Sequence, residues 1–205
     1  MIKAKTFIIF LAAVMILSAV AGCNGDDEAD TPHNEIGLAD LTAEQQDIVD
    51  LLAVPNLHEV LIFDFSTEEA FSSIEFWVEV YRNGILIEQP AGVMTVLDTA
   101  DQQSGRLAVI INQSTNYHWT LSVITGGTRS SHASTADSKI DSSLATATGA
   151  IEAPVIIEDG KEIILYKALF TAGSMTVYDH QTFQDRPELL RDYIHVHLIK
   201  CKFVK

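Results

Sequence analysis

The sequence has little positive charge. It contains 13 Lys and Arg against 28 Asp and Glu in 205 residues, which gives a formal net charge of −15. Nucleic acids and anionic lipid headgroups repel a chain of this sign, because they are negatively charged themselves. We therefore expect no nucleic-acid partner, and any attachment to a membrane must come from something other than electrostatic attraction.

Recognisable catalytic motifs are absent as well. The sequence has no G-x-S-x-G, no H-E-x-x-H, no phosphate-binding glycine loop and no paired C-x-x-C. Ser, His and Asp occur throughout, so a triad that only folding assembles stays open. The sequence predicts no cofactor, and we expect a protein that is not an enzyme.

The one long apolar run covers residues 7–17, between two lysines and a series of small residues. This pattern is typical of a secretory signal, and the run is too short to span about 30 Å of hydrocarbon. Val20-Ala21-Gly22-Cys23 resembles the lipobox of bacterial lipoproteins. The resemblance implies cleavage before Cys23, acylation of its sulfur, and a membrane partner reached through that lipid. An ordinary signal peptide, or an uncleaved anchor with an incidental cysteine, is the alternative.

Cysteine is scarce: Cys23 and Cys201 are the only two. If Cys23 carries lipid, Cys201 has no partner within the chain, and a disulfide framework is excluded. We expect Cys201 to be a small buried apolar residue. Residues 23–40 are acidic and contain Gly and Pro, which predicts a flexible tether rather than a cation site. Residues 41–205 are then a single β-rich domain behind the signal peptide 1–22.

A short helix is predicted at the start of this domain. Thr42 is a suitable N-cap, and Gln45 completes a capping box three residues later. Pro55 ends the helix. We expect the helix to pack its apolar stripe against the sheets, and the stripe consists of Ile48, Val49, Leu51 and Leu52.

After the helix the apolar residues recur with a period of two, which is typical of strands. Strands are predicted over 59–65, 74–81, 93–97, 106–112, 117–125 and 194–204. Many short strands with tight turns favour an all-β fold, mainly an antiparallel β-sandwich. A partly open β-barrel is the alternative.

Two dipeptides predict two-residue hairpin turns, Asn83-Gly84 and Asp159-Gly160. The first turn predicts the cross-strand pairs Val80–Ile87, Arg82–Ile85 and Glu79–Glu88, with the first two on the core face. The second predicts Ile156–Ile163, Val155–Ile164 and an ion pair between Glu158 and Lys161.

The C-terminal strand has an inconsistent alternation. Val196 and Leu198 share a face with Lys200 and Lys202, whereas the other face carries two histidines and then Ile199, Cys201 and Phe203. A β-bulge near Leu198-Ile199 would place both apolar sets in the core and the histidines and lysines in water. We predict that bulge.

Residues 126–149 are rich in Ser and Thr. This stretch either contains an edge strand near 143–148 or forms a mobile binding loop. We favour a surface excursion without an assigned role.

His195-x-His197 has the spacing of metal ligands on one face of a strand. A zinc site would need a third ligand, for which His118, His180 or Glu79 are the candidates. Two solvent-facing histidines are the simpler interpretation. Glu79 and Glu88, as a cross-strand pair, could share a calcium ion or raise the pKa of one carboxyl, although screened surface charges explain them equally.

Trp77 and Tyr81 alternate with the apolar stripe of their strand, so both belong to its outer face. Exposed aromatic faces there would suit a carbohydrate, unless a second layer covers them. The sequence therefore favours a membrane-anchored lipoprotein of the cell envelope that binds an unknown envelope protein or glycan without catalysis, through an edge strand or the 126–149 stretch. The alternatives are a carbohydrate-binding module at Trp77 and Tyr81, and a metal-binding protein or hydrolase that uses His195 and His197.

Overall fold

The computed structural model describes residues 34–53, 58–97, 103–113 and 116–205. The signal peptide, the lipobox with Cys23 and the first part of the tether lie outside these residues. In the described ranges, no helix has the length and apolar character needed to cross a membrane.

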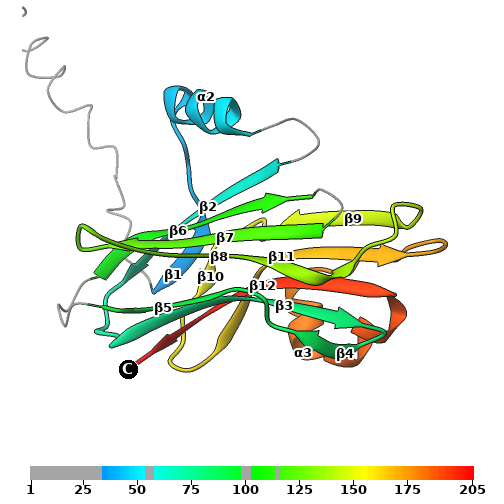
Figure 1. Ribbon diagram of the computed structural model, residues 1–205. Coiled ribbons are helices and arrows are strands. Elements are labelled where there is room, and N and C mark those ends of the chain that lie inside the picture. Colours follow the sequence, from blue (N-terminus) through cyan, green and yellow to red (C-terminus); the bar gives the residue numbers. More distant parts are fainter. Residues whose placement is uncertain (1–33, 54–57, 98–102, 114–115) are drawn as a thin grey trace, which may run out of the picture. The chain divides into compact units, whose positions relative to one another are not determined.

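The chain forms two antiparallel sheets, labelled in Figure 1. Sheet A has the order β10-β1-β2-β6-β7-β8. Its strands are β1 (Glu35–Leu38), β2 (His58–Thr67), β6 (Gln103–Asn112), β7 (Asn116–Thr125), β8 (Thr128–Lys139) and β10 (Val155–Ile156). Strand β1 lies within residues 23–40, for which the sequence predicts a flexible tether.

Sheet B has the order β4-β3-β12-β11-β9, and β5 also pairs with β3. Its strands are β3 (Ser73–Arg82), β4 (Ile85–Glu88), β5 (Gly92–Val96), β9 (Ala145–Ala150), β11 (Glu162–Thr171) and β12 (His195–Val204). Helix α2 (Ala43–Leu52) precedes β2. Helix α3 (His180–Asp185) and the 3₁₀ helix η1 (Pro187–Asp192) lie between β11 and β12.

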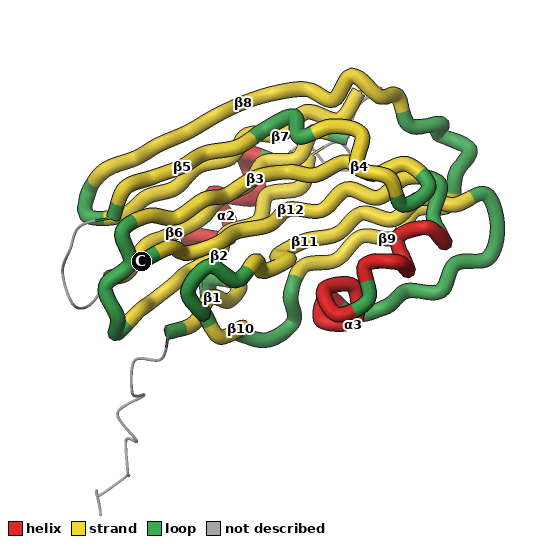
Figure 2. Tube along the Cα trace, turned by 90° about the horizontal axis from the view of Figure 1, so that it is seen from below, coloured by secondary structure: helices red, strands yellow, loops and turns green. Residues whose placement is uncertain are grey.

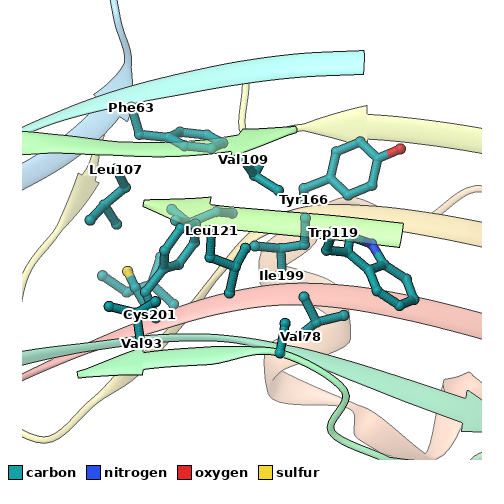
Figure 3. Packing of buried hydrophobic residues seen from close by; sticks show 14 of the residues in the cluster. Phe63, Val78, Val93, Leu107, Val109, Trp119, Leu121, Tyr166, Ile199 and Cys201 are labelled. Carbon is teal, nitrogen blue, oxygen red and sulfur yellow. The ribbon is translucent and has the colours of Figure 1, made fainter. Parts of the chain in front are cut away.

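The main core lies between the inner faces of the two sheets, where Figure 3 shows side chains from both sheets pointing toward each other. Alternation places every second residue of each strand there. The core therefore collects Leu107, Val109, Trp119 and Leu121 from sheet A, and Val78, Ile199 and Cys201 from sheet B. The predicted all-β sandwich is confirmed, and Cys201 is buried as expected, which raises the pKa of its thiol.

The Asn83-Gly84 turn is confirmed, since both residues have positive φ values of 50° and 76°. The register behind it is only partly as predicted. Arg82 pairs with Ile85, but an irregularity next to Val80 leaves this residue opposite Glu88. The predicted Val80–Ile87 and Glu79–Glu88 pairs are therefore wrong. Ile85 is also 68% exposed, so the Arg82–Ile85 pair does not face the core.

The second predicted hairpin does not form. Val155 and Ile156 pair with β1 in sheet A, whereas β11 belongs to sheet B. The chain uses residues 157–161 to change sheets. Glu158 and Lys161 nevertheless form the predicted ion pair, at 2.5 Å.

Strand β12 is straight. It pairs with β3 without a register shift along its whole length, from His195 opposite Arg82 to Val204 opposite Ser73. The bulge predicted at Leu198-Ile199 is therefore wrong. The irregularity lies instead in β11, between Ile164 and Tyr166, and it turns both Leu165 and Tyr166 into the core.

Two other stretches also differ from expectation. The capping box of α2 is present, but Ile48 and Leu51 of its apolar stripe do not pack on the sheets, because they are 54% and 84% exposed. The Ser/Thr-rich stretch 126–149 is not a loop excursion. It forms β8, at one edge of sheet A, and β9, at one edge of sheet B, the latter close to the edge strand considered near 143–148.

A second, smaller core covers part of the outer face of sheet B. Figure 2 shows α3 in front of one end of this sheet. The segment that contains α3 and η1 contributes Phe183, Leu189, Leu190 and Tyr193, which pack on outward residues of β11 and β12. Those outward residues are Ile164, Leu169, Val196 and Leu198. This layer explains the C-terminal alternation, because Val196 and Leu198 point outward and are still buried.

Candidate functional site

Beyond the layer formed by α3 and η1, the outer face of sheet B is open and hollowed. A groove of about 480 Å³ lies there, over β3, β5, β11 and β12. Outward side chains dominate its lining, as alternation in the three long strands requires. The lining residues are Glu75, Phe76, Trp77, Glu79, Gln89, Gly92, Val93, Met94, Glu162 and Lys202.

The groove exists beside Trp77 because its cross-strand neighbour has no side chain. Trp77 pairs directly with Gly92 of β5, and directly opposed residues of antiparallel strands project to the same face. A Cβ atom at Gly92 would lie 3.5 Å from Cβ of Trp77 and would meet no backbone clash. The backbone of Gly92 does not adopt a positive φ, so the conformation does not require glycine. A larger side chain at this position would therefore fill the groove without straining the strand.

Glu79 is the polar centre of the groove wall. Its carboxylate accepts hydrogen bonds from Trp77 Nε1 at 3.0 Å, from Tyr81 Oη at 2.6 Å and from Gln89 Nε2 at 3.4 Å. Lys200 Nζ lies 2.7 Å from the same carboxylate. Burial by itself raises the pKa of Glu79, but the hydrogen bonds from Lys200, Tyr81 and Trp77 outweigh it and lower that pKa. Glu79 is thus held as an anion rather than as a protonated acid.

Two lysines pair with the acids of the wall, and Lys202 also lines the groove. Lys200 bridges Glu79 and Glu162, with 3.0 Å to the second carboxylate. Lys202 Nζ lies 2.9 Å from Glu75 and 6.0 Å from the centre of the Trp77 ring, within the range of a cation–π contact. These outward lysines are therefore paired with acids across the strands. The groove offers both donors and acceptors around one half-buried indole.

The two aromatic residues singled out in the sequence have different surroundings. Trp77 lines the groove, as a binding role would require. Tyr81 projects from the same face, but its ring packs beside the core under α3 and its hydroxyl donates to Glu79. Burial and the neighbouring Glu79 raise the pKa of Tyr81. Tyr81 therefore holds Glu79 in place and does not line the groove.

The calcium hypothesis for Glu79 and Glu88 is not supported by the geometry. The two residues are not opposite each other, and Glu79 is engaged with four donors. Glu88 accepts a hydrogen bond from the backbone nitrogen of Asp137 instead, at 3.1 Å.

His195 and His197 share a face, as predicted, but it is the inner face and not the solvent side. His197 is 1% exposed and lies among Tyr117, Trp119 and Phe170, with ring centres 4.6–5.3 Å from its own. Burial lowers the pKa of His197 to about 3. Among the residues that the structure describes, no group of three His, Cys, Asp or Glu could hold a metal ion. The pair therefore lacks the third ligand that the metal hypothesis needed.

Sequence reasoning missed most of the groove. Its residues Gln89, Gly92, Glu162 and Lys202 come from four different segments. The sequence feature that could have indicated the groove is the alternation in β12, where Lys200 and Lys202 lie on the same face as Val196 and Leu198. We interpreted that signal as a bulge, although it marks the boundary between a covered and an open surface.

Fold and groove together define an all-β sandwich domain with an open groove, bordered by ion pairs, on the outer face of one sheet. The family model of the YgaN domain matches residues 35–203, and the chain belongs to this family. The matched range begins at β1 and ends one residue before the last residue of β12. No curated protein and no solved structure matches the chain in the corresponding comparisons.

Proposed function

We propose that this protein is a lipid-anchored domain on the extracytoplasmic side of a bacterial membrane, which binds a ligand or envelope partner in the Trp77 groove without catalysis. The observation that carries the binding role is the groove itself, with Trp77 beside it and paired charges around it. Its size is typical of ligand sites, which measure about 300–1,000 Å³. The groove takes the place of the 126–149 stretch as the contact surface.

The anchoring half of the proposal rests on the lipobox resemblance at Cys23. Mass spectrometry of the chain isolated from bacterial membranes tests it. We expect a chain that begins at Cys23 and carries acyl groups, and a Cys23→Ser variant that carries none. A bare thiol at Cys23, or a leader that is still attached, would contradict the anchoring.

A carbohydrate is the second, narrower candidate for the ligand. The observation that favours it is the half-buried Trp77 in an open groove rich in hydrogen-bonding groups, since an indole face can stack on a sugar ring. Screening of envelope glycans tests this idea. We expect one glycan class to bind the wild-type chain and to be lost with Trp77→Ala and with Gly92→Val.

The matched control for the glycan screen is Val96→Ala. Val96 belongs to the same strand and the same face as Gly92, but it lies outside the groove lining and is 76% exposed. Retained binding by Val96→Ala with loss by Gly92→Val would place the sugar in the groove. Equal binding by all variants would remove the carbohydrate candidate.

A further inference from the structure

Sheet edges expose unpaired backbone groups, and proteins usually protect them from pairing with other chains. In the described part of the chain, sheet A ends at β10 and β8, and sheet B ends at β9 and at the β4–β5 side of β3. Three of these edges carry recognisable protection. The fourth, β9, has the least protection.

The protected edges use three different devices. Strand β10 is only two residues long, and Pro154 lies against Gly37 of the neighbouring β1. Strand β8 carries charged residues, and its register is interrupted between Asn116 and His118 of its partner β7. The β4–β5 side is split into two short strands, and β5 lies against β8. There His132 Nδ1 is 2.9 Å from the carbonyl oxygen of Gly92.

Strand β9 has fewer of these features. Among the described residues, its contact of the same kind is His180 Nε2, 3.1 Å from the carbonyl oxygen of Gly149, a residue that pairs with Lys167 of β11. The sequence of β9, Ala-Thr-Ala-Thr-Gly-Ala, has no charge and no proline, and it pairs with β11 over six residues without a register shift. The ladder also shows which of its backbone groups point away from β11. Ile151 donates to Leu165 at 3.0 Å, so the odd-numbered residues direct their N–H and C=O groups toward β11. The even-numbered Thr146, Thr148 and Ala150 therefore direct theirs outward.

We propose that β9 is a self-association edge, at which β9 of a second copy pairs antiparallel with it about a two-fold axis at Thr148. In this register Thr148 faces its own copy, and Thr146 faces Ala150. All three residues then exchange their outward-directed backbone groups, because hydrogen-bonded pairs must join outward-directed residues. The pairing would join two five-stranded paths into one continuous sheet.

Charge and size favour a second copy as the occupant. The chain is acidic overall, yet no charged residue lies within Ala145–Ala150, so no like charges meet across this seam. The nearest acid on one side, Glu152, falls opposite Leu144. The facing side chains are Thr, Ala and Gly, which allow close approach of the two backbones. This inference is independent of the groove and of the lipid anchor.

Cysteine cross-linking of the full-length chain in its membrane tests the register directly. Opposed residues in a hydrogen-bonded pair have Cα atoms about 5.5 Å apart, which suits a disulfide. Thr148→Cys should therefore cross-link to itself under mild oxidation. Thr146→Cys is the matched control on the same exposed strand, because its two copies would lie roughly 13 Å apart at about 3.3 Å per residue. The wild-type chain gives the background from Cys23 and the buried Cys201.

The expected result is a dimer band for Thr148→Cys well above background and none above background for Thr146→Cys alone. A mixture of chains carrying Thr146→Cys and chains carrying Ala150→Cys should cross-link as well. Equal cross-linking of Thr148→Cys and Thr146→Cys would show random collision, and no cross-linking of either would show an unoccupied edge. Both outcomes would overturn the proposal.

Discussion

The outer face of sheet B has two halves that differ in their surroundings. In one half, Val196 and Leu198 of β12 lie under α3 and η1 and are almost completely buried. In the other half, Lys200 and Lys202 of the same strand and the same face pair with carboxylates, and Lys202 lines the open groove. The change from apolar to lysine therefore follows the edge of the covering layer and needs no change in the strand.

This difference shows what a period-two pattern can and cannot report. Alternation reports which residues share a face of a strand, and it did so correctly for β12. It does not report what covers that face, because the covering segment comes from elsewhere in the chain. Each half is expected to respond differently to the same kind of substitution.

The largest expected effect is in the covered half. Leu198→Ala should lower the free energy of unfolding by about 2–5 kcal/mol, because it leaves a cavity in a closed apolar cluster. Lys202→Ala, four residues on and on the same face, should cost no more than about 1 kcal/mol, because its ion pair with Glu75 is partly exposed to solvent. Urea denaturation of both variants measures the contrast. Similar losses for the two would break the comparison.

The inner face of β12 is a third environment, and the pH dependence of stability tests it. The folded chain holds His197 neutral with a pKa near 3, whereas the unfolded chain has the ordinary value of 6.5. Between these values the unfolded state binds more protons, so stability should fall by roughly 1.4 kcal/mol for each pH unit below about 6.5. His197→Phe should lose this part of the pH dependence.

His197→Phe should also keep its stability at neutral pH, since neither ring nitrogen of His197 has a hydrogen-bond partner among the described residues. Unfolding curves measured at several pH values test both expectations. An unchanged pH profile in the variant would show that His197 is not the group that titrates.

A smaller effect is expected at the centre of the groove. Glu79→Gln should lower the free energy of unfolding by about 1–3 kcal/mol, because it removes the negative charge to which Lys200, Tyr81 and Trp77 donate hydrogen bonds. Glu75→Gln is the matched control, since Glu75 also pairs with a lysine but is more exposed, and it should cost at most about 1 kcal/mol. Because the pKa of Glu79 is lowered in the folded chain, this carboxylate contributes to stability above pH 4.5, and the contribution is lost in stronger acid. Equal costs for the two variants would remove Glu79 from the centre of the network.

Much of the fold was predictable from local patterns. The strand around Trp119, the Asn83-Gly84 turn and the Thr42 capping box each depend on neighbours within a few residues, and all are present. Strand β8 was missed because its Ser and Thr residues have no apolar alternation to detect. The Asp159-Gly160 turn was recognised, but β10 before it pairs with β1 in sheet A, whereas β11 after it belongs to sheet B.

The site was less predictable for the same reason. Trp77 was assigned to the outer face from the parity of β3, and it does line the groove. Its surroundings depend on Gly92 and Lys202, which pair with β3 from 15 or more residues away and only in the folded chain. The burial of His197 likewise depends on Tyr117 and Trp119 in the other sheet.

The most direct test of the open half is a binding comparison between the wild-type chain and Gly92→Val. Valine favours strands and would stand beside the Trp77 ring, so the fold should be unchanged while the groove is filled. With envelope extract as the source of ligand, we expect the wild-type chain to retain a specific glycan or protein that Gly92→Val loses. Equal retention by both chains, with Gly92→Val still folded, would contradict the assignment of the groove as the binding surface.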